Sequence, residues 1–143
     1  MHPKYLILST MLAALLVACA PGGEGAAESD GDARTVSVTM TDEFRFEPEE
    51  FTFAAGETVR FEVINSGAIV HEFLIGDEAA QAEFAEQMAG MEEDHDSAAG
   101  VSVEPGETME FTYTFDTAGD LLAGCHEPGH YEAGMVATIT VEP

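Results

Sequence analysis

Apolar and polar residues alternate with a period of two along most of this chain, and this alternation constrains the fold more than any other feature. It is plainest at 35–41, where Val36, Val38 and Met40 alternate with serine and threonine, and it returns at 57–64. Such alternation is typical of strands with one buried face. Further strand-like runs lie at 44–53 with a break at Pro48, 73–75, 101–103, 107–115, 120–124 and 135–141. Many short strands with regular turns predict an all-β fold, a β-sandwich, over residues 35–143.

One segment, residues 77–91, departs from the strand pattern and predicts a helix. Phe84, Met88 and Met91 lie at positions i, i+4 and i+7, as in an amphipathic helix that packs its apolar face on a sheet. Asp77 is placed to cap the first turn. We therefore expect one short helix inserted between strands.

The first 18 residues predict a signal peptide of the lipoprotein type. Lys4 precedes an apolar stretch at 5–17 that is short for a membrane span, and the segment ends in Leu-Val-Ala-Cys19. This ending resembles a bacterial lipobox, so we expect cleavage before Cys19 and lipid on its sulfur; the alternative is an ordinary secretory signal with an incidental cysteine. Residues 19–34 predict a disordered acidic tether. The domain is therefore expected outside the cytoplasm, in the periplasm or at the cell surface, held to the membrane by lipid.

The charge of the chain excludes one class of partner. Lys and Arg together number 4 against 28 Asp and Glu, giving a net charge of −24. Nucleic-acid binding requires basic patches, so no nucleic-acid partner is expected. The acidic residues are spread along the whole chain. This distribution favours a surface adapted to high salt over a local patch that attracts a basic partner.

Metal-binding side chains are concentrated in residues 125–135, Cys-His-Glu-Pro-Gly-His-Tyr-Glu-Ala-Gly-Met. This segment offers the thiolate of Cys125, the imidazole of His130 and the thioether of Met135. Copper in a site of two histidines, one cysteine and a weak axial methionine requires these donors and one more histidine. His71, which opens a strand-like run, is the best candidate. We therefore predict one copper ion bound by His71, Cys125, His130 and Met135.

Other metals and cysteine pairings fit the donor types less well. Zinc accepts cysteine and histidine, but a thioether is a poor ligand for it. Iron–sulfur clusters need more thiolates than Cys125 offers. A disulfide between Cys125 and Cys19 is disfavoured because Cys19 has its own explanation in lipidation.

Two further sets of donors leave alternatives open. His126 follows Cys125 directly, as in multicopper oxidases, but those enzymes need several His-x-His pairs and this chain has 5 histidines in all. We expect His126 to be solvated or to lie beside the copper site. Met88, Met91 and His95 offer donors for a second copper(I) contact, but core packing of a helix on a sheet explains the two methionines better.

The pattern Cys-x₄-His-x₄-Met with a distant upstream histidine resembles the cupredoxins, the small blue copper proteins, with a spacing most like that of rusticyanin and auracyanin. Residues 46–61, which read Phe-x-Pro-x-x-Phe-x-Phe-x-x-Gly-Glu-x-Val-x-Phe, are similar to the early strands of that family. The resemblance covers residues 35–141. It implies a Greek-key β-sandwich with one type 1 copper. One departure is Glu72, which follows His71 where many cupredoxins carry an asparagine that ties the two ligand loops together.

The resemblance also implies a function. It predicts a monomer that is not an enzyme and that carries single electrons, by cycling between Cu(I) and Cu(II), between extracytoplasmic redox proteins of the cytochrome or oxidase type. The alternative is a copper-tolerance protein that sequesters copper outside the cytoplasm. Some cupredoxins of that kind carry a segment rich in histidine and methionine after the first ligand, and residues 76–97 resemble it faintly.

Overall fold

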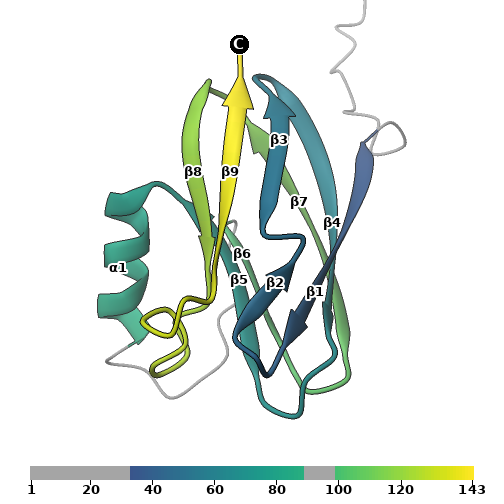
Figure 1. Cartoon of the computed structure of the whole chain (residues 1–143). Helices are drawn as coiled ribbons and strands as arrows, with labels where there is room; N and C mark the ends of the chain where they lie inside the picture. The colour runs from purple at the N-terminus through teal and green to yellow at the C-terminus, as the bar shows by residue number, and fades with distance from the viewer. Residues whose placement is uncertain (1–32, 89–98) are drawn as a thin grey trace, which may run out of the picture.

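The computed structural model describes residues 33–88 and 99–143, which form two packed β-sheets with one helix beside them (Figure 1). One sheet has the strand order β2-β1-β4-β7 and the other β3-β9-β8-β5-β6. The elements are β1 (Arg34–Thr41), β2 (Arg45–Glu47), β3 (Glu50–Ala54), β4 (Glu57–Asn65), β5 (His71–Gly76), α1 (Glu78–Met88), β6 (Gly100–Val103), β7 (Thr108–Phe115), β8 (Gly119–Gly124) and β9 (Val136–Glu142). This is the predicted all-β sandwich with one short helix.

The chain crosses between the two sheets at the predicted break around Pro48. On its N-terminal side β2 pairs with β1 in the four-stranded sheet, and on its C-terminal side β3 pairs with β9 in the five-stranded sheet. Proline lacks the amide proton that a continuous strand would need. The break therefore lets one phenylalanine-rich segment contribute to both sheets.

Aromatic side chains from both sheets fill the core between them. In β4 the alternation predicted from the sequence is observed, because Val59, Phe61 and Val63 are buried while the intervening residues are not. Phe53 of one sheet stacks on Phe115 of the other with ring centroids 4.4 Å apart. These contacts join the two sheets and fix the ends of their strands relative to each other.

Strand β5 differs from the others because all six of its residues are buried. It lies between β6 and β8 in its sheet, and α1 packs on β5 and β8 (Figure 1). The helix thus covers part of one face of the five-stranded sheet, over β5 and β8. The neighbouring residues His71 and Glu72 are both buried, although their side chains leave the strand in opposite directions.

The helix α1 begins as predicted but buries a different side chain. The Asp77 carboxylate accepts a hydrogen bond from the Ala80 amide at 2.8 Å, which confirms the predicted cap. Its buried residue is Gln81, whereas Phe84 and Met88 are only half-buried. The prediction of an apolar buried face was therefore wrong at its centre. The physical reason is that strand carbonyls beneath the helix need hydrogen-bond donors, which an apolar side chain lacks.

Several sequence predictions concern residues outside those that the structure describes. These are the signal peptide at 1–18, the lipidated Cys19, the tether up to residue 32, and Met91 and His95 of the second copper contact. Among the helices of the described ranges, none has the length and apolar character needed to cross a membrane.

Candidate metal centre

The loop at 125–135 folds back on itself, so its donor residues lie together. The amide of Cys125 donates to the carbonyl of Met135 at 3.2 Å, and the amide of Met135 donates to the carbonyl of His130 at 3.0 Å. Gly129 and Gly134 adopt positive φ angles of 83° and 99°, which a residue with a side chain rarely takes. The sequence of turns therefore closes the loop at the end of β8.

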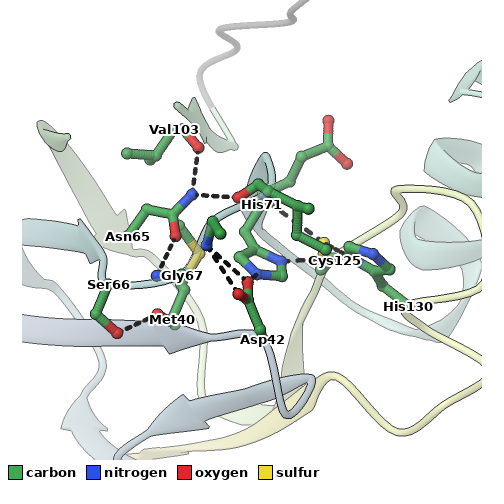
Figure 2. A network of polar contacts seen from close by, with 12 residues as sticks. Met40, Asp42, Asn65, Ser66, Gly67, His71, Val103, Cys125 and His130 are labelled. Carbon is green, nitrogen blue, oxygen red and sulfur yellow. Dashed lines mark hydrogen bonds and ion pairs between the residues drawn. The ribbon is translucent and has the colours of Figure 1, made fainter. Parts of the chain in front are cut away.

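Three of the four predicted ligands meet between β5 and this loop (Figure 2). The donor atoms of His71, Cys125 and His130 all lie within 4.8 Å of one another, and all three residues are buried. The Nδ1 atom of His130 is 3.3 Å from Nδ1 of His71 and 3.3 Å from Sγ of Cys125. Met135, the fourth predicted ligand, is fully buried, and its main chain forms hydrogen bonds with the main chains of Cys125 and His130.

Burial affects the protonation of two of these donors, Cys125 and His130, in the metal-free protein. It raises the pKa of the Cys125 thiol to about 12, so the sulfur carries a proton near neutral pH. Burial lowers the pKa of His130, which keeps its imidazole neutral and its lone pair available. One thiolate and two neutral imidazoles suit copper in both oxidation states. A metal ion that binds here must first displace the thiol proton.

Glu72 links the two halves of this cluster. Its amide donates to the sulfur of Cys125 at 3.3 Å, and its side-chain Oε2 accepts a hydrogen bond from the amide of His126 at 3.1 Å. The carboxylate is fully buried. Many cupredoxins carry an asparagine where this chain has Glu72, and the sequence left open whether Glu72 can join the two ligand segments as that asparagine does. In the structure, Glu72 joins β5 to the ligand loop through these two bonds.

His126 is buried but is not part of the metal-binding cluster. Its Nε2 lies 2.7 Å from Oε1 of Gln81, and its ring stacks on Tyr131 with centroids 4.7 Å apart. Gly124 leaves the space for this arrangement, since a Cβ there would lie 2.5 Å from the Gln81 oxygen. The prediction that His126 lies beside the site fits this position, whereas the alternative of a solvated side chain does not.

Two residues that contact this region were missed in the sequence. Gln81 donates its amide protons to the carbonyls of Leu74 and Leu122, both at 3.0 Å, while its oxygen faces His126. Asp42 places Oδ1 3.3 Å from Nε2 of His71. Hydrogen bonds, chiefly from the Ala68 amide, hold the pKa of Asp42 below its usual value. Neither residue belongs to a recognisable local motif, so no sequence signal identified them.

Comparison with known proteins agrees with this geometry. Residues 33–142 match the family described as copper binding proteins, plastocyanin/azurin family. The chain therefore belongs to the cupredoxins, and its cofactor is one type 1 copper ion. The family is described by copper binding and not by a reaction.

Two curated relatives and one solved structure are informative. The chain is 41% identical over 116 residues to the copper-resistant cuproprotein CopI of Rubrivivax gelatinosus, covering 78% of this chain and 70% of that protein. It is 35% identical over 141 residues to the protein of the same name from Pseudomonas aeruginosa, covering 78% and 77%. The crystal structure of dithionite-reduced auracyanin from the photosynthetic bacterium Roseiflexus castenholzii superimposes with a TM-score of 0.68 at 25% identity, covering 79% of this chain and all of that one.

Proposed function

We propose that His71, Cys125 and His130 bind the copper ion and that Met135 is its weak axial ligand. The observation that carries this proposal is the buried cluster of one sulfur and two imidazole nitrogens within 4.8 Å of one another. A copper ion held by these donors supplies a one-electron Cu(II)/Cu(I) couple. The surrounding strands and the closed loop hold the donors in place, so little rearrangement should accompany a change of oxidation state.

The colour of the oxidised protein tests this ligand set. Copper(II) bonded to a cysteine thiolate in this set should absorb visible light strongly and bleach on reduction. Cys125→Ser should abolish that absorption, and His126→Gln, which changes the neighbouring residue outside the cluster, should retain it. An intensely coloured Cys125→Ser protein would show that the sulfur is not a ligand.

We infer that the physiological role is copper tolerance outside the cytoplasm. The two relatives named copper-resistant cuproproteins support this role, as they are 41% and 35% identical to the chain. The predicted signal peptide supports an extracytoplasmic location. Deletion of the gene should slow growth in added copper and leave growth without copper unchanged, and the wild-type gene but not Cys125→Ser should restore tolerance.

Single-electron transfer is the second candidate, and the structure supports it through the enclosure of the site. All three clustered donors are buried, and the fold matches that of a dithionite-reduced auracyanin. A monomeric carrier would exchange electrons with a redox partner of the cytochrome or oxidase type. In that case deletion should impair electron flow even without added copper, an outcome that would contradict a role in tolerance alone.

We also propose that Cys19 carries the lipid that anchors the protein to the membrane. The lipobox-like ending of the signal peptide supports this assignment. The protein should separate with membranes, and Cys19→Ala should change where it is found. An unmodified Cys19 inside the mature chain, detected by mass spectrometry, would refute the anchor.

A further inference from the structure

The turn between β1 and β2 brings a carboxylate to the outer nitrogen of His71. Asp42, in this turn, places Oδ1 3.3 Å from Nε2 of His71 (Figure 2). The imidazole is fully buried, whereas the aspartate side chain is 44% exposed. The ring of His71 thus has its Nε2 edge toward a carboxylate and its Nδ1 edge toward the other two donors of the cluster.

Asp42 is held by the loop that precedes β5. The amide of Ala68 donates to both carboxylate oxygens, at 3.0 Å and 2.8 Å. A Cβ on Gly67 would lie 2.1 Å from Oδ1 of Asp42, so the absence of a side chain there allows the carboxylate to approach. The position of the carboxylate is therefore fixed by the local backbone.

The loop itself is held by Asn65, which is buried. Its side-chain oxygen accepts from the amide of Gly67 at 2.9 Å, and its side-chain nitrogen donates to the carbonyls of Ile69 and Val103, each at 2.8 Å (Figure 2). Because Val103 belongs to β6, these bonds attach the loop to the five-stranded sheet that contains His71. Carboxylate, loop and ligand strand therefore form one connected unit.

The contact determines which nitrogen of His71 is free to bind metal. An ionised carboxylate only accepts hydrogen bonds, so Nε2 must carry the imidazole proton. Nδ1 then has a free lone pair, and this atom faces His130 at 3.3 Å. A negative charge on the far side of the ring also makes the imidazole a stronger donor, as in carboxylate–histidine–metal arrangements.

We propose that Asp42 is a positioning residue for the copper site, which fixes Nδ1 of His71 as the metal-binding atom and stabilises Cu(II) relative to Cu(I). This inference rests on the proposed ligand set. Asp42 does not touch the metal; it acts through the imidazole. The carboxylate should therefore tune the reduction potential while the ligands themselves stay unchanged.

Asp42→Asn and Glu43→Gln form a matched pair that tests the proposal. Each removes one negative charge from the same turn, but the structure gives only Asp42 a contact with His71, and Glu43 is exposed. Asparagine keeps the shape and an acceptor oxygen. We expect Asp42→Asn to lower the ratio of Cu(II) to Cu(I) affinity by about tenfold, the scale of such outer contacts, which corresponds to a rise in potential of about 59 mV. Glu43→Gln should change it far less because solvent screens an exposed charge.

A second measurement follows the imidazole without copper. In the metal-free protein, nitrogen NMR should find the proton of His71 on Nε2, and Asp42→Ala should increase the population with the proton on Nδ1. A purely structural role would lower the melting temperature of the variants but leave both the tautomer and the potential as in the wild type.

The outcomes separate this inference from the ligand set on which it depends. Equal potential shifts in Asp42→Asn and Glu43→Gln, or an unchanged tautomer in Asp42→Ala, would overturn the role of Asp42. If His71→Ala retained the spectrum and copper affinity of the wild type, the ligand set itself would be wrong. A differential shift together with loss of copper binding in His71→Ala supports both.

Discussion

His71 and His126 are two buried histidines close to Cys125, one in space and the other along the chain, yet of the two only His71 belongs to the metal-binding cluster. The Nε2 atom of His71 faces the carboxylate of Asp42, and that of His126 faces the amide oxygen of Gln81. Both partners accept a hydrogen bond, so both rings have a lone pair on Nδ1. The tautomer is thus the same, and the difference lies in direction. His71 points Nδ1 at His130, whereas His126 stacks on Tyr131 beside α1.

This comparison shows that closeness in sequence to the cysteine does not make a histidine a ligand. His126 is bonded directly to Cys125 along the chain, but a residue and its neighbour in an extended segment point to opposite sides. His71 comes from a different strand and reaches the sulfur through the fold. One histidine helps to build the metal site, and the other joins the ligand loop to the helix.

Replacing each of the two histidines by alanine should give the largest difference in copper affinity. His71→Ala removes a strong donor and should lower copper affinity by more than about 100-fold, beyond the loss caused by removing a group that only supports a ligand. His126→Ala should keep copper affinity within about tenfold of the wild type. Competition titrations with a copper chelator measure both values, and similar losses in the two variants would remove the distinction between the histidines.

Removing the partner of His126 should affect folding more than copper. Gln81→Leu leaves the carbonyls of Leu74 and Leu122 and the ring of His126 without their hydrogen bonds, so the free energy of unfolding should fall by about 1–3 kcal/mol. Glu83→Gln, on the exposed side of α1, should stay within about 0.5 kcal/mol of the wild type. Urea titrations compare them, and equal stabilities would show that this contact is dispensable.

The pH dependence of copper binding should reflect the Cys125 thiol. Because burial raises the pKa of Cys125 from 9.0 to about 12, copper displaces a proton from the sulfur throughout the neutral range. Affinity should therefore rise about tenfold per pH unit between pH 7 and 9. His126→Ala should show the same slope because its ring exchanges no proton for metal. A flat profile in the wild type would mean that the thiol is already ionised in the metal-free protein.

The same shift in pKa has a consequence for stability without metal. A folded-state pKa above that of the unfolded thiol stabilises the fold below pH 9, and this contribution is lost as pH rises toward 12. The metal-free protein should therefore lose stability above pH 9, and Cys125→Ala should lose less. Denaturant titrations at several pH values measure the difference.

The smallest expected effect concerns the axial position. Met135→Leu keeps a buried apolar side chain of similar size but removes the thioether, so copper should stay bound through the three stronger donors. The potential should rise because the apolar group disfavours Cu(II). Voltammetry measures the change, and an unchanged potential would exclude Met135 as a ligand.

The sequence predicted those parts of the protein that depend on residues close together along the chain. Strand positions followed from alternation, and the donors of the loop were recognisable because they lie within residues 125–135. Asp42 and Gln81 could not be found in this way. They meet His71 and His126 across separations of 29 and 45 residues, and such contacts exist only after the sheets and the helix pack together. The polar centre of α1 was missed as well, since Gln81 bonds to main-chain carbonyls of two neighbouring strands, and β8 comes beside β5 only when the sheet forms.

The spacing of the clustered donors along the chain has a consequence for how the copper-bound protein unfolds. Cys125 and His130 are 5 positions apart, whereas His71 and His130 are 59 apart. A metal ion that kept the wider pair joined in an unfolded chain would close a large ring and lower its entropy by the equivalent of about 4 kcal/mol at room temperature. Keeping the Cys125–His130 pair joined would cost the unfolded chain about half as much, about 2 kcal/mol. During unfolding, copper should therefore dissociate from His71 first and stay bound for longer to Cys125 and His130.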